Sequence, residues 1–260
     1  MSLLHDTFAR AKADNRAVLI GYLPAGFPSR DGAIECLLAM IDGGVDIVEI
    51  GLPYSDPVMD GPTIQAAVDI SLNGGTKIPD VIDTVRAVAQ SGAPVLVMSY
   101  WNPIERFGIE KFTTELASAG GVGVITPDLT PEEASAWLTT TDSHDIDRVF
   151  LVALSSTNER IATVANVTTG FVYAGAVMGV TGARTNLSDA VKDLVARVRP
   201  HTDLPVAVGL GVSTPEQAHD IAQFADGVIV GSAFVTAINN GGAAAARELA
   251  VKLSAGLGRS

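Results

Sequence analysis

Eight short runs of β-branched residues, each followed by a segment with helical spacing, constrain the fold of this chain more than any other feature. Gly, Pro or Asp bounds each run, as is typical of buried parallel strands. Eight strand–helix units in 260 residues predict an α/β fold, a single (β/α)8 TIM-barrel domain spanning residues 1–260. The expected strands cover residues 17–23, 46–52, 94–100, 122–128, 148–154, 170–175, 205–211 and 226–232.

A doubly wound open sheet is the alternative, but it usually has fewer strands, and no Gly-x-Gly-x-x-Gly follows the first run. Helix signals agree with the barrel. One helix is expected to begin at Ser29 and end at Gly43, and another lies between Pro79 and Gly92. Two more are expected to open on Thr-Pro-Glu-Glu/Gln at Thr130 and Thr214, where a capping box would form.

Charge and composition exclude several classes of partner. The formal net charge is −12, so nucleic acid and anionic membranes are poor partners. The single cysteine, Cys36, allows no internal disulfide, and we expect it to be buried in a helix. The first residues lack a basic start followed by an apolar core, and no long apolar window occurs. We therefore expect a cytoplasmic protein.

The segment VEIGLPYSDPVMDGPTIQ, residues 48–65, places three acids at and after the second strand. Glu49 alternates with aliphatic neighbours, so it should point into the barrel near the catalytic end of the strand. A carboxyl that loses solvent there gains proton affinity and can act as an acid or base near neutral pH. Asp56 and Asp60 follow in a loop of Gly and Pro. We expect Asp56 to be mainly structural, whereas Asp60 could be structural or functional.

Three glycine-containing segments are candidates for phosphate binding. They are GVTGAR (residues 179–184), GLGVS (209–213) and VGSAF (230–234), after which a short helix is expected to start at Ser232. Barrels often bind phosphate with the last two loops and the N-terminus of a short helix. Glycine lets the phosphate approach backbone N–H groups without a Cβ in the way.

The reactive residues available narrow the chemistry further. The lysines fall on helices or their approaches, which disfavours a Schiff-base mechanism. The four histidines form no cluster with metal-ligand spacing, and Cys36 lies on a helix. Carboxylate acid–base chemistry on a small phosphorylated substrate, without a cofactor in this chain, is what remains.

These motifs resemble one known family. VEIGLPYSDPVMDGPTIQ, GVTGAR and ADGVIVGSAFV are similar to segments of tryptophan synthase alpha subunits, and AGFPS, YWNP and TPDLTPEEA agree. The resemblance covers essentially the whole chain. It implies a lyase that cleaves indole-3-glycerol phosphate to indole and glyceraldehyde 3-phosphate. It also implies an alpha2-beta2 heterotetramer, in which a beta subunit with pyridoxal phosphate receives the indole.

The resemblance further implies the roles of individual residues. Glu49 and Asp60 would be catalytic, Glu49 transferring protons and Asp60 stabilising positive charge at the indole N–H. Thr181 would lie on a loop that closes over the substrate and bonds with Asp60. The substrate-binding residues that it implies are Tyr22, Tyr100, Tyr173, Thr181, Gly182, Gly211, Gly231 and Ser232. It implies no metal ligand.

Three alternatives remain open at this point. The chain could be another phosphate-binding barrel enzyme, such as an isomerase or epimerase. It could be a non-catalytic subunit that only activates a beta partner, or a lyase that releases indole without one. A substrate panel would separate the first alternative from the lyase, and an indole-release assay with and without a beta subunit is the most informative single experiment.

Overall fold

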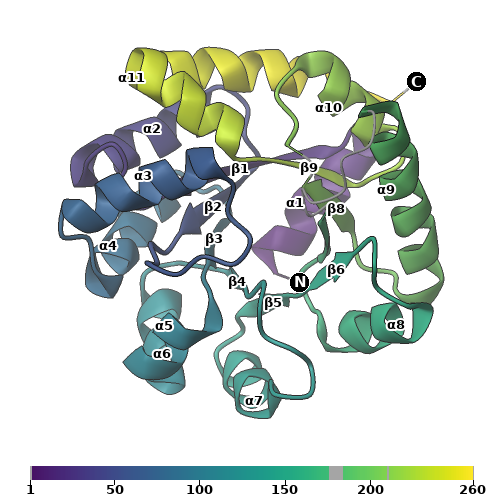
Figure 1. Cartoon of the computed structure of the whole chain (residues 1–260), viewed down its shortest axis with the longest axis horizontal. Helices are drawn as coiled ribbons and strands as arrows, with labels where there is room; N and C mark the ends of the chain where they lie inside the picture. Colours follow the sequence, from purple (N-terminus) through teal and green to yellow (C-terminus); the bar gives the residue numbers. More distant parts are fainter. Residues whose placement is uncertain (1, 176–183, 210, 260) are drawn as a thin grey trace.

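A computed structural model describes residues 2–175, 184–209 and 211–259, and its parallel strands form a ring surrounded by helices (Figure 1). All eight predicted strands are present, and the predicted TIM barrel is confirmed. Most strands are shorter than the apolar runs that predict them, whereas β1 and the segment from β5 to β6 have the predicted length, shifted by one residue. The strands are β1 (Val18–Pro24), β2 (Ile47–Gly51), β3 (Val95–Met98), β4 (Gly123–Ile125), β5 (Asp147–Val149), β6 (Leu151–Ala153), β7 (Val172–Gly175), β8 (Val206–Gly209) and β9 (Gly227–Val230).

The ring of strands closes at the fifth predicted strand. The sheet order is β5-β4-β3-β2-β1-β9-β8-β7-β6, with parallel pairing between all neighbours. β5 and β6 are two halves of one predicted strand, separated only by Phe150. The first half pairs with β4 and the second with β7, so the chain itself joins the two ends of the sheet.

Two layers of apolar side chains hold the barrel together. The inner layer includes Ile20, Ile47 and Leu96, and the outer layer, between strands and helices, includes Val48 and Ile50. Residues 47, 49 and 51 share one face of β2 because side chains alternate along a strand. Glu49 therefore points into the barrel, as the sequence predicts.

Helices surround the sheet, and one of them lies across its base (Figure 1). Leu4 and Phe8 of the first helix belong to the inner apolar layer. A Cβ on Gly227, the first residue of β9, would lie 3.3 Å from the Phe8 ring. This helix therefore plugs the end of the barrel where the strands begin. The helices are α1 (Leu3–Ala13), α2 (Arg30–Asp42), α3 (Pro62–Asn73), α4 (Ile78–Ala89), α5 (Trp101–Phe107), α6 (Ile109–Ser118), α7 (Ser135–Ser143), α8 (Asn158–Val167), α9 (Arg184–Val198), α10 (Pro215–Ala222) and α11 (Ser232–Ala255).

Most predicted helix ends are confirmed. Ser29 caps α2 by accepting the Gly32 N–H at 3.1 Å, and Gly43 is the C-cap. Thr214 and Gln217 form the predicted capping box of α10. Cys36 is buried on α2, also as predicted.

The predicted start of a helix at Thr130 is wrong. Residues 130–134 form a turn instead, in which Glu133 N–H donates to the Thr130 carbonyl at 3.1 Å. The Ala134 N–H donates to the Pro131 carbonyl in the same three-residue pattern, and α7 begins only at Ser135. The Thr-Pro-Glu-Glu signal reflects only neighbouring residues in the sequence. Because this segment lines a cavity described below, its tertiary contacts determine its conformation instead.

The helix expected at Ser232 begins there but is longer than predicted. α11 runs to Ala255 and is kinked at Gly241 and Gly242, whose backbone angles are not helical. Its N-cap, Gly231, directly follows β9. The helix therefore starts at the catalytic end of the strands before it bends away to pack along α2.

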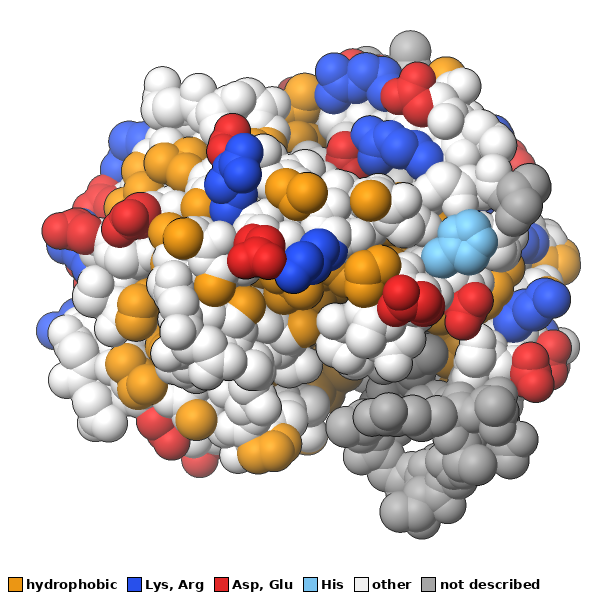
Figure 2. Space-filling model, turned by 90° about the horizontal axis from the view of Figure 1, so that it is seen from above, with side chains coloured by type: hydrophobic (Ala, Val, Ile, Leu, Met, Phe, Trp, Pro, Cys, Tyr) orange, Lys and Arg blue, Asp and Glu red, His pale blue; other side chains and the backbone are white. Residues whose placement is uncertain are grey.

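The surface carries charges of both signs. On the face shown in Figure 2, basic and acidic side chains are interspersed with apolar ones. In the described ranges, no helix combines the length and the apolar character that crossing a bilayer requires.

Candidate active site

Glu49 is the most deeply buried acid of the site. It is 1% exposed, and neither carboxylate oxygen has a hydrogen-bond partner among the described residues. Burial raises its pKa from 4.5 to about 8. In the strand register it lies between Tyr22 on β1 and Leu96 on β3. At neutral pH this carboxyl holds a proton that it shares with no neighbour, so it can give that proton to a bound molecule.

Tyr22 packs directly beside Glu49 on the inner face of the barrel. Burial raises its pKa well above 10, and the negative charges of Asp60 and Glu49 raise it further. Its ring lies over two glycines at the ends of neighbouring strands: a Cβ on Gly51 would lie 2.3 Å from its hydroxyl, and one on Gly231 would lie 3.2 Å from its ring. Glycine at both positions is therefore what lets the ring lie flat across the barrel.

Tyr173 occupies the opposite side of the same interior. It follows Phe171, and the two ring centroids lie 6.5 Å apart. Burial raises its pKa, and the charges of Glu49 and Asp60 add to the effect. A Cβ on Gly209 would lie 2.4 Å from its hydroxyl, so this ring too depends on a glycine at a neighbouring strand end.

Asp60 reaches the site from the loop between β2 and α3. Burial raises its pKa, and hydrogen bonding with the Tyr100 hydroxyl lowers it in part. The same hydroxyl accepts the Met59 N–H at 2.9 Å. Tyr100 thus does more than line the site, because it holds the segment that carries Asp60. Asp56, by contrast, bonds with the neighbouring Ser55 hydroxyl at 2.6 Å on the exposed part of the loop.

The candidate phosphate segments lie at the ends of β8 and β9, which are neighbours in the sheet. Gly211 has φ +68°, a left-handed conformation that favours glycine, and among the described residues beyond its chain neighbours no atom lies within 4 Å of where its Cβ would be. Gly231 and Ser232 form the start of α11. Backbone N–H groups at such a helix start attract anions. Thr181 and Gly182 lie outside the described residues.

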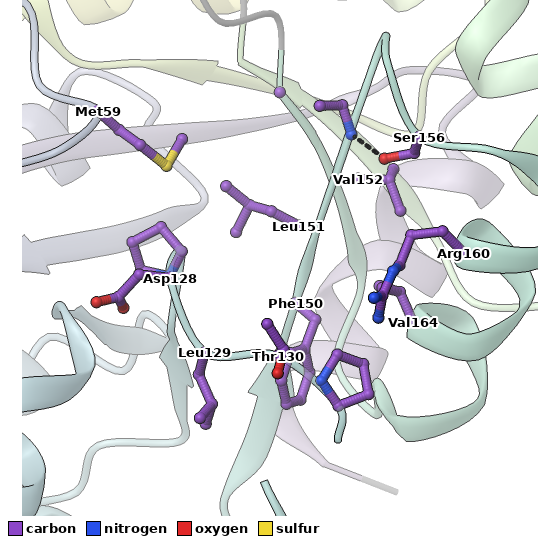
Figure 3. Close-up of a pocket in the computed structure, with 14 residues that line it drawn as sticks. Met59, Asp128, Leu129, Thr130, Phe150, Leu151, Val152, Ser156, Arg160 and Val164 are labelled. Atoms are coloured by element: carbon purple, nitrogen blue, oxygen red, sulfur yellow. Dashed lines mark hydrogen bonds between the residues drawn. The ribbon is translucent and has the colours of Figure 1, made fainter. Parts of the chain in front are cut away.

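A cavity of about 330 Å³ adjoins these residues (Figure 3). Met59, beside Asp60, contributes to its wall, and so does Leu151, which pairs with Tyr173 in the sheet. Glu49 itself is not in the wall, so the cavity lies next to the acid rather than around it. Its lining is mostly apolar and comes from Met59, Pro127, Asp128, Leu129, Thr130, Pro131, Phe150, Leu151, Val152, Ala153, Ser156, Arg160, Val164 and Gly175.

Sequence reasoning missed Asp128, which follows β4 at the same end of the barrel. Its carboxylate accepts the Trp101 N–H at 2.9 Å, and burial raises its pKa. The signal was present, because Asp128 ends the predicted strand 122–128, and a barrel places its functional groups at such strand ends and in the loops that follow. Among the described residues, no three His, Cys, Asp or Glu side chains come together in a group that could hold a metal ion.

Comparison with known proteins decides the family. The model of the family described as tryptophan synthase alpha chain matches residues 8–256. The chain belongs to the tryptophan synthase alpha chain family. It is 53% identical to the tryptophan synthase alpha chain of Acidothermus cellulolyticus, over 100% of this chain and 98% of that protein. It is 52% identical to that of Nocardia farcinica, over 98% and 96%.

Solved structures agree with this assignment. A chain in a crystal structure of tryptophan synthase from M. tuberculosis, an open form with BRD0059 bound, superposes with a TM-score of 0.94. The two chains are 46% identical, and each is covered completely. As a tryptophan synthase alpha chain, the protein is a carbon–carbon lyase of tryptophan biosynthesis. It cleaves indole-3-glycerol phosphate to indole and glyceraldehyde 3-phosphate.

Proposed function

We propose that Glu49 is the proton-transfer group of this lyase and that Asp60 assists it. The burial of Glu49 carries the proposal: its pKa of about 8 keeps the carboxyl protonated at neutral pH. A protonated acid in a water-poor site can add its proton to a weakly basic carbon. The inward direction of β2 at residue 49 supports placing that carbon inside the barrel mouth.

The cleavage then balances without a Schiff base. Glu49 protonates C3 of the indole ring, which leaves a positively charged indolenine. Removal of the proton from the hydroxyl on the adjacent glycerol carbon turns that carbon into an aldehyde. The bond from this carbon to C3 breaks, and its electron pair restores the aromatic ring. The carboxylate left by the first step accepts the hydroxyl proton, so Glu49 ends the cycle protonated.

Asp60 would stabilise the intermediate charge. In the indolenine, positive charge is shared with the ring nitrogen, and a carboxylate beside that N–H lowers its energy. The loop position of Asp60, with the amide of the preceding Met59 held by the Tyr100 hydroxyl, supports this role. We further propose that Asp60 bonds with the Thr181 hydroxyl when the two loops close over substrate.

Aromatic rings would bind the indole part of the substrate, and backbone N–H groups would bind its phosphate. Tyr22, Tyr100 and Tyr173 would surround the indole side of the substrate, next to the apolar cavity. The phosphate would bind backbone N–H groups at Gly211, Gly231 and Ser232, for which the left-handed glycine and the start of α11 are the support. Thr181 and Gly182 are proposed to complete this site.

We propose a tryptophan synthase beta subunit as partner, in an alpha2-beta2 complex. The full-length similarity to a chain of M. tuberculosis tryptophan synthase supports it. Pyridoxal phosphate would belong to the beta subunit, and this chain would need no cofactor. We also propose a cytoplasmic location. Residues 1–260 would form one domain, since the first and last strands of the ring pair with each other.

Replacing Glu49 with Gln tests the proposed role most directly. The amide keeps the shape of the side chain but cannot transfer a proton. We expect indole release to fall at least about 100-fold, the minimum typical of a positioned acid, while glycerol phosphate binding is unchanged. Glu35→Gln, on the exposed side of α2, is the matched control and should keep normal turnover.

Indole release and glycerol phosphate binding should each be measured with and without a beta subunit. A Glu49→Gln variant that kept more than about a tenth of normal turnover would rule out the assignment. If the unmodified chain released no indole in either condition, the chain would be an activating subunit only. Full release without the beta subunit would indicate a lyase that works alone.

A further inference from the structure

Asp128 caps a helix to which it does not belong. α5 begins at Trp101, and its N-cap residue, Tyr100, makes no side-chain capping bond. Asp128, in the loop after β4, accepts the Trp101 N–H at 2.9 Å. One of the unpaired N–H groups at a helix start is thereby satisfied from the neighbouring strand. The bond ties the loop after β4 to the point where β3 turns into α5.

The residue at this turn, Tyr100, is fixed from several sides. Its carbonyl accepts the Ser99 hydroxyl at 2.7 Å, and its ring packs against Tyr54 with centroids 5.6 Å apart. The side chain is only 5% exposed. Because the Tyr100 carbonyl and the Trp101 amide belong to one peptide group, these bonds hold the backbone that follows Tyr100, and this helps to set where the phenol ring points.

The Tyr100 hydroxyl also contacts the loop after β2, so the position of the Tyr100 ring affects the position of that loop. The hydroxyl accepts the N–H of Met59, the residue before Asp60, at 2.9 Å, and its interaction with the Asp60 carboxyl lowers the pKa of that group. A phenol hydroxyl can do both, because it has one proton to donate and lone pairs to accept. Figure 3 shows Met59 and Asp128 on the same side of the cavity wall. The loops after β2 and β3 thus meet at the Tyr100 hydroxyl, and the loop after β4 joins them at the neighbouring Trp101 amide.

We propose that Asp128 is a positioning residue for the cleavage: by holding the Trp101 amide, it fixes Tyr100, and through the Tyr100 hydroxyl it fixes Asp60. This inference rests on the proposed role of Asp60 at the indole N–H. Asp128 transfers no proton and touches no reacting atom. Its contribution is to hold the Asp60 carboxylate where charge develops, since small displacements of a catalytic group are costly.

Two substitutions at Asp128 separate positioning from direct chemistry. In Asp128→Asn the side-chain oxygen can still accept the Trp101 N–H, whereas in Asp128→Ala it cannot. We expect kcat to fall about tenfold in Asp128→Ala, the scale of one lost hydrogen bond to a charged group, and to change little in Asp128→Asn. Thr157→Ala removes the N-cap of α8 in the same way but has no bond to Tyr100, and it should leave kcat unchanged.

The pH profile reports on Asp60 itself. The bond from Tyr100 lowers the pKa of Asp60, so its loss raises that pKa. The acid limb of kcat/KM should therefore move to higher pH in Tyr100→Phe and Asp128→Ala, but not in Asp128→Asn or Thr157→Ala. The double variant Asp128→Ala/Tyr100→Phe should be no slower than the slower single variant, because both changes interrupt the same chain of contacts from Asp128 through Tyr100 to Asp60.

Asp60→Asn in the same assay distinguishes this inference from the proposed function. If Asp60→Asn kept normal turnover, the proposed function itself would fail. If Asp60→Asn were inactive while Asp128→Ala kept the normal kcat and acid limb, only the positioning role would be overturned. An Asp128→Asn variant about tenfold slower than the parent would also overturn it. That result applies even if Asp128→Ala fails to fold, because the amide variant preserves the cap.

Discussion

The hydroxyl of Tyr22 lies over Gly51 at a distance that leaves no room for a side chain there. A Cβ on residue 51 would lie 2.3 Å from the Tyr22 hydroxyl oxygen. Both residues are at the catalytic end of adjacent strands, and their backbones are paired through Pro24 and Gly51. The size of residue 51 therefore determines where the Tyr22 ring lies above Glu49.

Gly51→Ala should displace Tyr22 and slow the enzyme. Overpacking of this kind costs about 1–3 kcal/mol, and we expect kcat/KM for indole-3-glycerol phosphate to fall about tenfold or more. In a Tyr22→Ala background the added methyl has nothing to displace, so the second substitution should cost little. Steady-state kinetics of the four proteins give the interaction energy, and strictly additive losses would contradict the contact.

Glu49→Gln should change the pH dependence of stability. The folded pKa of Glu49 is about 8 and its ordinary value is 4.5, so between these values the folded state binds one more proton than the unfolded state. Stability is then lost as pH rises from about 4.5 towards 8, by about 1.4 kcal/mol per unit. The variant has no such loss. Thermal unfolding should show its advantage over the parent growing between pH 5 and pH 8, and a constant difference would contradict the raised pKa.

Gly211→Val should weaken binding of the substrate's phosphate. The position has φ +68°, and its Cβ would project into open space where a phosphate could approach. Gly92→Val is a matched control, because Gly92 has φ +82° and equally free space but lies between α4 and β3 at the other end of the barrel. Both variants should lose about the same stability from backbone strain. KM should rise only in Gly211→Val, and equal KM values would place the phosphate elsewhere.

Thr214→Ala and Thr130→Ala should differ although their sequence contexts are nearly the same. Thr214 accepts the Gln217 N–H as the cap of α10, whereas Thr130 lies in a turn five residues before α7. Loss of a true cap costs about 1 kcal/mol. Denaturant unfolding should therefore show a loss of that size at 214 and a small one at 130. Comparable losses would mean that the turn at 130–134 is stabilised by its threonine after all.

These two threonines also show where sequence reasoning stops. The strands could be predicted because β-branched runs need burial on both faces wherever they occur in a parallel sheet. The inward direction of Glu49 followed from alternation alone. The turn at Thr130 could not be predicted, because Pro131 and Thr130 line a cavity whose other wall comes from α8, far along the chain. Local capping signals carry no information about such a neighbour.

The same limit applies to Tyr100 and Asp128. The sequence places both at strand ends, and the resemblance supplied a ring-lining role for Tyr100. The Met59 N–H donates to the Tyr100 hydroxyl and the Trp101 N–H donates to Asp128, so these bonds join loops separated by many residues, which no spacing rule predicts. Thr181 and Gly182 lie outside the described residues, and their roles stay predictions.

The helix across the base of the barrel has a consequence for the order in which products depart. Leu4 and Phe8 are packed into the inner layer, so side chains of α1 fill the described part of the barrel at that end. Indole and the phosphorylated aldehyde must then leave through the same mouth by which the substrate entered. The product that is bound nearer to α1 then leaves after the other product. A protein bound at the mouth of the barrel could receive the first product released. The release of both products would then be controlled at this one opening.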